Sequence, residues 1–298
     1  MPAGTVASSI VTNPPRVRQL AEGVWGFTRR SPVGGVSATV LVVLIVVAVL
    51  APWLAPHHPN EFLKGKRLLP PGREFLMGTD SLGRDVLSRV IYGSRVSLLV
   101  GFLSVAIGTA MAVVVGLTSG YWSGKLDLVL QRVVDTLMAF PPVVLALALV
   151  AFLSPSLHNV ILVIGILVFS QAARVVRGMV LSVKENAYVE AARALGAGHP
   201  RILLRHILPN IVAPIIVVSS VFLGHAIIIE AAMSFLGMGT PPDIPSWGGM
   251  LSREGRRNLE MGPWLALFPG IAISVTVLAF NLFGDALRDT LDPRLRQG

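Results

Sequence analysis

Cysteine is absent from this chain of 298 residues, which excludes a disulfide framework and any metal centre held by thiolates. Charged residues are scarce too, at 14% against about 25% in soluble domains. Aromatic residues make up only 7%, whereas 53% of the residues are hydrophobic and the mean hydropathy is +0.70. A composition this apolar predicts an all-α polytopic membrane protein.

The motifs of common enzymes are also missing. The nearest approach to the phosphate-binding pattern G-x-x-x-x-G-K-[ST] is Ser123-Gly124-Lys125, but Ser119 takes the first glycine position and Leu126 the hydroxyl position. The six histidines do not form H-E-x-x-H or another metal-ligand spacing. We therefore predict no catalytic residue, no cofactor and no metal, and a chain that does not hydrolyse ATP alone.

The net charge is +9. In a soluble chain such a surplus would favour nucleic acid as a partner. In a membrane protein it indicates cytoplasmic loops and contact with anionic membrane lipid, so we expect no nucleic-acid partner.

Apolar stretches predict six spanning helices with both termini on one side of the membrane. They cover residues 36–54, 96–115, 136–153, 159–173, 211–229 and 264–283. The larger share of the 25 Lys and Arg residues falls on the side of the termini and of residues 174–210, which predicts that this side is cytoplasmic. Residues 1–35 and 286–298 are then cytoplasmic tails.

Between the first two spans, residues 77–95 hold apolar side chains such as Val86 and Val90 at helical spacing, with Arg84 and Arg89 on other faces. The pattern predicts an amphipathic helix at the membrane interface. The alternative is a polar extension of the second span with snorkelling arginines. With the first span and its outer loop, this helix makes up a unit of residues 36–95.

Proline and glycine mark two places inside the membrane region. Pro141-Pro142 interrupts the third span and frees backbone groups, which indicates a bend beside a translocation path or a kink that serves packing alone. Gly116, Gly120 and Gly124 recur every four residues and would allow a neighbouring helix to approach closely.

The far end of the fifth span carries Glu230, which is either a functional group or a polar residue satisfied at the membrane edge. Phe235 and the structured outer loop over residues 237–262 follow. Trp247 and Trp264 suit an interfacial aromatic belt. Glu230, Phe235 and Trp247 are our candidates in this outer region.

Residues 186–210 predict two short helices around one sharp turn. Asn186 is a candidate N-cap, and Gly196 stands where a left-handed residue would close the first helix. Pro200 suits the first turn of the second helix, and Pro209 ends or kinks that helix. From the residues alone, an ordinary alanine-rich hairpin and a docking surface for a partner are both open.

The same stretch resembles the "EAA" loop of ABC importer permeases, since Glu190-Ala191-Ala192 is followed after three residues by Gly196 and then by Leu208-Pro209. His206 departs from the general pattern, which has Ile there. The resemblance implies a type I ABC importer permease fold, with this loop as a cytoplasmic coupling element for an ATPase. The coupling residues that it implies are Glu190, Ala191, Ala192, Ala194, Leu195, Gly196, Pro200 and Arg201.

Two more stretches resemble the dipeptide/oligopeptide/nickel group of these permeases: Gly78-Thr79-Asp80 with Gly83-Arg84-Asp85, and Ser234-Phe235-Leu236-Gly237 with Pro245-Ser246-Trp247-Gly248. A tail, one span and a longer first loop ahead of a core at residues 96–285 resemble the C-type subunit. The resemblance implies alternating-access import of dipeptides or oligopeptides across a bacterial plasma membrane.

The implied partners are a second permease in a heterodimer, two cytoplasmic ATPase subunits or a fused ATPase, and an extracytoplasmic substrate-binding protein. Haem, a nickel chelate or a glycopeptide remain open as cargo. Rival classes are an ion-coupled secondary transporter or channel, which needs intramembrane ionisable groups such as Glu230, and a membrane enzyme, which needs a catalytic constellation.

Overall fold

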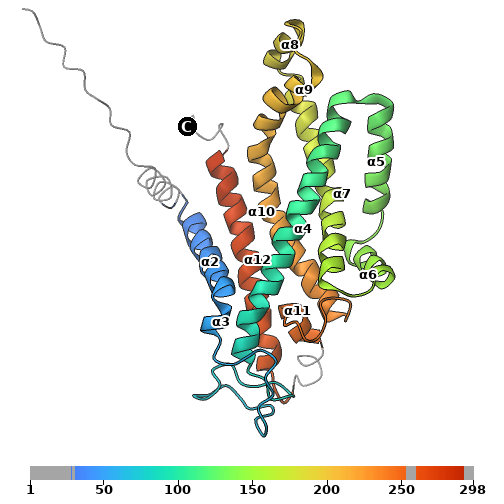
Figure 1. Ribbon diagram of the computed structural model, residues 1–298. Coiled ribbons are helices and arrows are strands. Elements are labelled where there is room, and N and C mark those ends of the chain that lie inside the picture. The colour runs from blue at the N-terminus through green and yellow to red at the C-terminus, as the bar shows by residue number, and fades with distance from the viewer. Residues whose placement is uncertain (1–27, 29–30, 253–259, 292–298) are drawn as a thin grey trace, which may run out of the picture.

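The computed structural model describes residue 28 and residues 31–252 and 260–291, and its described part is a bundle of helices, as predicted (Figure 1). Five of its helices are long and apolar enough to cross a membrane, and a bent pair gives a sixth span if its two halves count as one. The long helices are α2 (Pro32–Val49), α4 (Val86–Trp122), α7 (Leu157–Lys184), α10 (Leu208–Phe235) and α12 (Trp264–Leu291).

The first span begins before its predicted start. The Ser31 hydroxyl accepts a hydrogen bond from the Gly34 N–H, and Pro32 takes the first turn, so α2 starts inside the predicted tail of residues 1–35. The span is also divided at Leu50, because Pro52 cannot donate to the helix; α3 (Ala51–Leu54) follows. The rest of the predicted N-terminal tail lies outside the described residues, apart from Thr28.

Residues 77–95 do not form a separate interfacial helix, which corrects that prediction. The helix begins only at Val86, where the Asp85 carboxylate accepts from the Ser88 N–H at 2.9 Å and from the Ser88 hydroxyl at 2.6 Å. It then runs without a break into the second span. Arg84 and Arg89 are buried rather than interfacial, because each interacts with Asp80.

Glycines allow α4 to lie directly against α7. A Cβ atom at Gly116 would come within 2.7 Å of the Val176 side chain, and one at Gly120 within 2.8 Å of Val180. These two glycines therefore serve the close approach that their spacing indicated. Gly124 does not, since it has open space around it and a φ of +67° that serves the turn into α5 (Gly124–Met138).

The third span is not one helix over residues 136–153. It consists of α5 and α6 (Pro142–Leu153), which meet at 92°. The fourth span also runs beyond its predicted end at residue 173, because Arg174 and Arg177 form ion pairs with Asp135 and Asp127 of α5 and so remain inside α7.

The predicted hairpin consists of α8 (Ala187–Ala194) and α9 (His199–Arg201), followed by a π-helical segment, η1 (Ile202–Ile207). Contrary to the prediction, Pro209 does not end the second helix of the hairpin. It lies in the first turn of α10, where a missing N–H is tolerated. At the other end of the chain, α12 continues to Leu291, so the predicted tail at 286–298 begins as helix, and residues 292–298 lie outside the described part.

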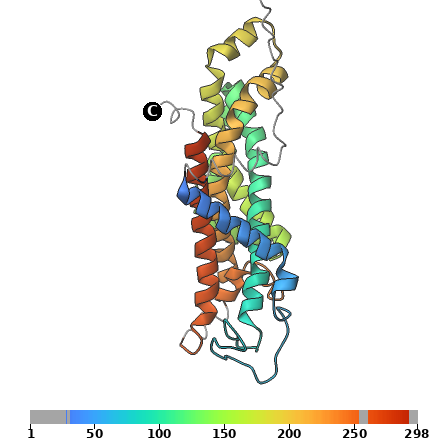
Figure 2. The same cartoon turned by 90° about the vertical axis from the view of Figure 1, so that its left-hand side faces the viewer.

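Figures 1 and 2 show the resulting arrangement. The α8–α9 hairpin projects from one end of the bundle, and α11 (Trp247–Met250) lies toward the opposite end with the loop that follows α3. Helix α2 crosses the bundle obliquely, in contact with α12 and α4. The two candidate regions are thus at opposite ends of the same long helices.

Candidate functional site

The turn between α8 and α9 is built around Gly196, whose φ of +77° is the left-handed conformation predicted for it. The Gly196 N–H donates to the Arg193 carbonyl and the Ala197 N–H to the Ala192 carbonyl, both at 3.0 Å. This pair of bonds is the Schellman arrangement, which satisfies the last carbonyls of α8. Asn186 precedes α8 as predicted but its side-chain amide donates to Val183 instead of capping the helix, which corrects that detail.

The hairpin, which we call the elbow (residues 186–201), presents its predicted coupling residues to the outside. Leu195 is 89% exposed, although an isolated leucine gains about 1.5–3 kcal/mol by burial. Ala192 is half-buried, and the remaining candidates are exposed. Those exposed candidates are Glu190, Ala191, Ala194, Gly196, Pro200 and Arg201.

The base of the elbow is anchored in an apolar cluster. Val189 is fully buried, and it packs in one cluster with Ile202 and Ile207 of the following segment. The same cluster includes Val176 and Val180 of α7, and Leu117 of α4. The exposed tip is therefore joined to the ends of α4, α7 and α10 through close packing.

Polar contacts add to this anchor. The Tyr121 hydroxyl at the end of α4 and Nδ1 of His199 are hydrogen-bonded at 2.7 Å. The Lys184 ammonium at the end of α7 donates to the Gly120 carbonyl at 3.0 Å and to the Ser123 hydroxyl at 2.8 Å. The ends of α4 and α7 are thus joined to each other and to the elbow.

Helix α5 is joined to α7 by charge. Arg177 donates two hydrogen bonds of 2.6 Å to the Asp127 carboxylate, which also accepts from the Ser119 hydroxyl of α4. Arg174 and Asp135 form a second pair nearer the middle of the bundle. The side of α5 turned to the bundle is therefore mixed, because the fully buried Val134 on it belongs to the apolar core. Exposed apolar residues such as Val129 and Val133 cover its outer side.

Pro141 and Pro142 lie at the corner between α5 and α6, and both are exposed, as is Phe140. In a continuous helix these two prolines would have donated to the carbonyls of Leu137 and Met138, but proline has no N–H. No hydrogen bond to those two carbonyls is found among the described residues. Figure 1 shows the corner about midway along α4.

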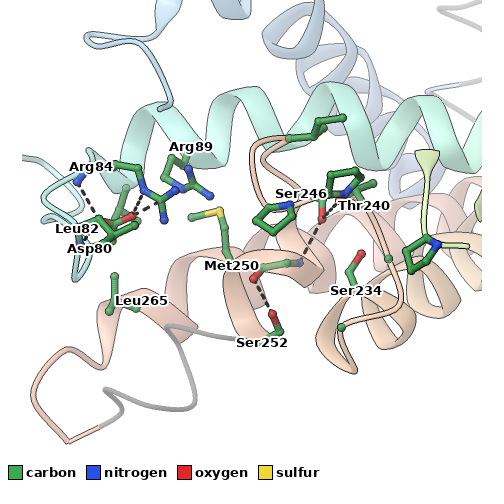
Figure 3. A pocket seen from close by; sticks show the side chains of 18 residues that line it. Asp80, Leu82, Arg84, Arg89, Ser234, Thr240, Ser246, Met250, Ser252 and Leu265 are labelled. Carbon is green, nitrogen blue, oxygen red and sulfur yellow. Dashed lines mark hydrogen bonds and ion pairs between the residues drawn. The ribbon is translucent and has the colours of Figure 1, made fainter. Parts of the chain in front are cut away.

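The opposite end of the bundle contains a pocket of about 440 Å³ (Figure 3). Asp80, Arg84 and Arg89 line one side of it, and the Arg84 Nε lies 2.5 Å from the Asp80 carboxylate. Ser234 and Ser246 lie toward the other side. Sequence reasoning identified these stretches by resemblance, but did not predict that they meet around one pocket.

The three outer candidates lie in different settings. Trp247 does not belong to an interfacial belt: it is 1% exposed, and its indole N–H donates to the Val90 carbonyl at 2.9 Å. Phe235 is the partly exposed last residue of α10 and not part of the loop. Glu230 is completely buried, and both of its carboxylate oxygens accept hydrogen bonds from serines, so it is a satisfied polar residue inside the protein rather than at a membrane edge.

Comparison with known proteins agrees with this architecture. Residues 112–297 match the family described as the binding-protein-dependent transport system inner membrane component, and residues 20–71 match the N-terminal TM domain of oligopeptide transport permease C. The chain is 42% identical over 287 residues to the glutathione transport system permease protein of Escherichia coli, covering 96% of this chain and 94% of that protein.

A second relative is a Brucella suis protein provisionally named a peptide transport system permease protein, 43% identical over 261 residues and 88% of each chain. Among solved structures, the inward-facing MetNI methionine ABC transporter shares the fold, with a TM-score of 0.59 at 18% identity over 69% of this chain and 98% of that one.

A polytopic bundle with a protruding elbow defines a membrane permease subunit. The chain belongs to the family of binding-protein-dependent transport system inner membrane components. It is the permease subunit of an ABC importer, which confirms the predicted class, and the match at residues 20–71 fits the predicted C-type subunit. Such a permease works with a second permease, an ATPase and a substrate-binding protein, and the ATPase is a separate component. The comparisons give no support to a secondary transporter.

Proposed function

We propose that this permease imports dipeptides or oligopeptides across a bacterial plasma membrane, as one half of a heterodimer with a homologous permease. Two ATPase subunits, or a fused ATPase, bind on the cytoplasmic side, where both termini of this chain also lie. The cargo follows from the peptide and glutathione transport named for its relatives. Within this group, the binding protein outside the membrane selects the cargo.

The elbow couples this permease to the ATPase. The observation that carries this proposal is the contrast between the exposed Leu195 at the tip and the fully buried Val189 at the base. Tyr188 of the elbow and Leu204 of the segment after it are exposed as well, and several exposed apolar side chains at the end of an anchored hairpin are suited to a groove on a partner. Closure of the ATPase pair on ATP would draw the elbows together and open the bundle outward, and hydrolysis would reset it.

Two substitutions test the coupling role in a reconstituted transporter. Gly196→Val strains the left-handed turn, and Glu190→Lys reverses a charge on the exposed face of α8. Both variants are expected to insert normally, to lose transport, and to release the ATPase at lower salt than the parent. Normal uptake by both variants would exclude the elbow as the coupling element.

The corner at Pro141 and Pro142 lines the translocation path. Backbone carbonyls without partners are tolerated at membrane depth only where protein or water meets them. The carbonyls of Leu137 and Met138, which lack helix partners at this corner, therefore favour a water-filled path over lipid, whereas a kink that served packing alone would be covered by other side chains. A single cysteine at Phe140 should react with a water-soluble thiol reagent, whereas one at the exposed Val43 of α2 should be protected by lipid.

A further inference from the structure

Glu230 is a buried carboxylate that neither the coupling elbow nor the α5–α6 corner uses. It lies on α10, and its exposed fraction is 0%. The Ser97 hydroxyl of α4 donates to Oε2 at 3.2 Å, and the Ser234 hydroxyl donates to Oε1 at 2.8 Å. Among the residues that the structure describes, no basic side chain forms an ion pair with it. Burying a carboxylate that only hydroxyl groups bind costs free energy. Its hydrogen bonds in turn fix the positions of the groups that donate them.

The segment that follows α10 packs on the same turn of the helix. We call residues 237–250 the outer cap. A Cβ atom at Gly248 would lie 2.5 Å from the Ala231 Cα, so this part of the cap fits against α10 only as glycine. Trp247 joins the cap to α4 through its bond to the Val90 carbonyl and its contact with Gly93. The cap therefore rests on α4 and α10 together.

Glu230 lies where these three elements meet. Ser97 belongs to α4 and Ser234 to α10, and the cap packs directly on Ser234, since a Cβ atom at Gly239 would lie 1.8 Å from the Ser234 hydroxyl oxygen. Ser246 begins α11 in the cap. Ser246 in turn accepts from the Gly249 N–H and from the Thr240 hydroxyl, both at 3.1 Å. The carboxylate thus holds the Ser234 side chain, on which the cap packs.

The same serines face the outer pocket. Ser234 and Ser246 both line it, and Ser234 gives its only hydrogen to Glu230. Because that hydrogen is used, the Ser234 oxygen can only accept hydrogen bonds from other groups in the pocket. Loss of the carboxylate would free the Ser97 and Ser234 hydroxyl groups to rotate, and the Ser234 hydroxyl lies directly against Gly239 of the cap.

We propose that Glu230 is a positioning residue that holds the outer cap in register on α4 and α10, and that the ordered cap is the surface that receives the substrate-binding protein. The second part rests on the proposed function, since it needs an importer whose binding protein docks at the end opposite the elbow. Glu230 contacts no cargo. It acts through Ser97, Ser234 and the cap.

The test uses the assembled transporter in lipid nanodiscs and four forms of this subunit: the parent, Glu230→Met, Glu230→Gln and Ser219→Ala. Methionine keeps the length of the side chain without its acceptors. Glutamine keeps one acceptor and supplies a donor that a serine oxygen can accept. Ser219 is the matched control, because its hydroxyl pairs with Thr109 across the same two helices but away from the cap.

Hydrogen exchange of residues 237–250 and ATP hydrolysis are measured for each form. For Glu230→Met we expect amide exchange in the cap to quicken about tenfold, since orphaned buried donors are costly. The concentration of substrate-binding protein that gives half of the maximal stimulation of ATP hydrolysis should rise by a similar factor. Basal hydrolysis without binding protein should be unchanged, and Glu230→Gln and Ser219→Ala should match the parent.

The proposal is overturned if Glu230→Met leaves cap exchange and half-saturation unchanged, or if Glu230→Gln is as defective as Glu230→Met. If Glu230→Met does not assemble, Ser97→Ala and Ser234→Ala decide the question, because each removes one donor; both must quicken exchange in the cap. A loss of transport and of ATPase attachment in the elbow variants, with normal exchange in the cap, concerns the coupling role alone, so failure of the two proposals can be told apart.

Discussion

Tyr121, the penultimate residue of α4, and His199, the first residue of α9, are hydrogen-bonded through Oη and Nδ1 at 2.7 Å. Their rings also meet edge to face, with centroids 5.5 Å apart. Since 78 residues separate the pair, this contact ties the elbow to a helix that runs the length of the bundle. It provides a direct route from the elbow, which we propose meets the ATPase, to the opposite end of α4.

Tyr121→Phe removes this hydrogen bond and keeps the ring contact. We expect normal assembly and a fall in transport per ATP hydrolysed, because a lost hydrogen bond of this kind weakens the joint by about 1 kcal/mol. Coupled uptake and hydrolysis in proteoliposomes measure the ratio. Thr118→Ala is the control, since the Thr118 hydroxyl bonds only to carbonyls of its own helix. Equal ratios in parent and Tyr121→Phe would remove Tyr121 from the route.

The turn of the elbow offers a pair of glycines for comparison. Gly196 has a φ of +77°, whereas Gly198 has a φ of −66° and no close neighbour to obstruct a methyl group. Gly196→Ala should destabilise the elbow by about 1–2 kcal/mol, and Gly198→Ala should not. Protease cleavage within residues 186–201 of the assembled complex reports the difference, and identical cleavage in both variants would contradict it.

Close packing of α4 on α7 depends on Gly120, where a Cβ atom would lie 2.8 Å from Val180, while Gly178 on α7 has open space around it. Gly120→Ala should lower the stability of the bundle by about 1–3 kcal/mol through overpacking. Gly178→Ala should be neutral or slightly stabilising, since alanine favours a helix. The thermal midpoint in detergent measures both, and a reversed order would show that the helices are not in contact at Gly120.

The Asp127–Arg177 ion pair links α5 to α7 through two hydrogen bonds. The two side chains are 14% and 31% exposed, in that order. Asp127→Asn should destabilise this junction by about 1.5–3 kcal/mol, the usual range for a hydrogen bond to a charged group. Glu74→Gln breaks the more exposed pair with Lys66 and should change stability by about 1 kcal/mol or less. Equal thermal midpoints for the two variants would argue against a stabilising role of the Asp127–Arg177 ion pair.

Much of this architecture can be predicted from the sequence. Hydropathy locates the five long spans and the bent pair α5–α6, because long apolar stretches admit little besides a helix in a membrane. Half of the predicted ends fall well inside the observed helices, which continue into polar sequence. The turn at Gly196 and the placement of Pro200 also follow from local chemistry, since few residues other than glycine favour a positive φ and proline suits a first helical turn.

The errors arise where contacts distant in sequence decide the structure. Arg89 reads as an interfacial charge because nothing nearby in the sequence reveals that it donates to the Pro59 carbonyl, 30 residues away. Arg84 is an exception, since its partner Asp80 is only four residues away. In the sequence, Arg174 and Arg177 are typical of the end of a span, but carboxylates of α5 allow α7 to continue past them. Trp247 resembled an interfacial anchor until Val90 and Gly93 of α4 proved to surround it.

The most direct measurement of the central claim uses the absence of native cysteine, which makes a single introduced thiol in this subunit specific. Leu195→Cys should resist membrane-impermeant thiol reagents added outside intact cells. In inverted vesicles it should form a cross-link to a cysteine placed in the groove of the ATPase subunit, with a yield that changes when ATP is added. Labelling of Leu195→Cys from outside the cell, or no cross-link to the ATPase under any nucleotide condition, would contradict the account.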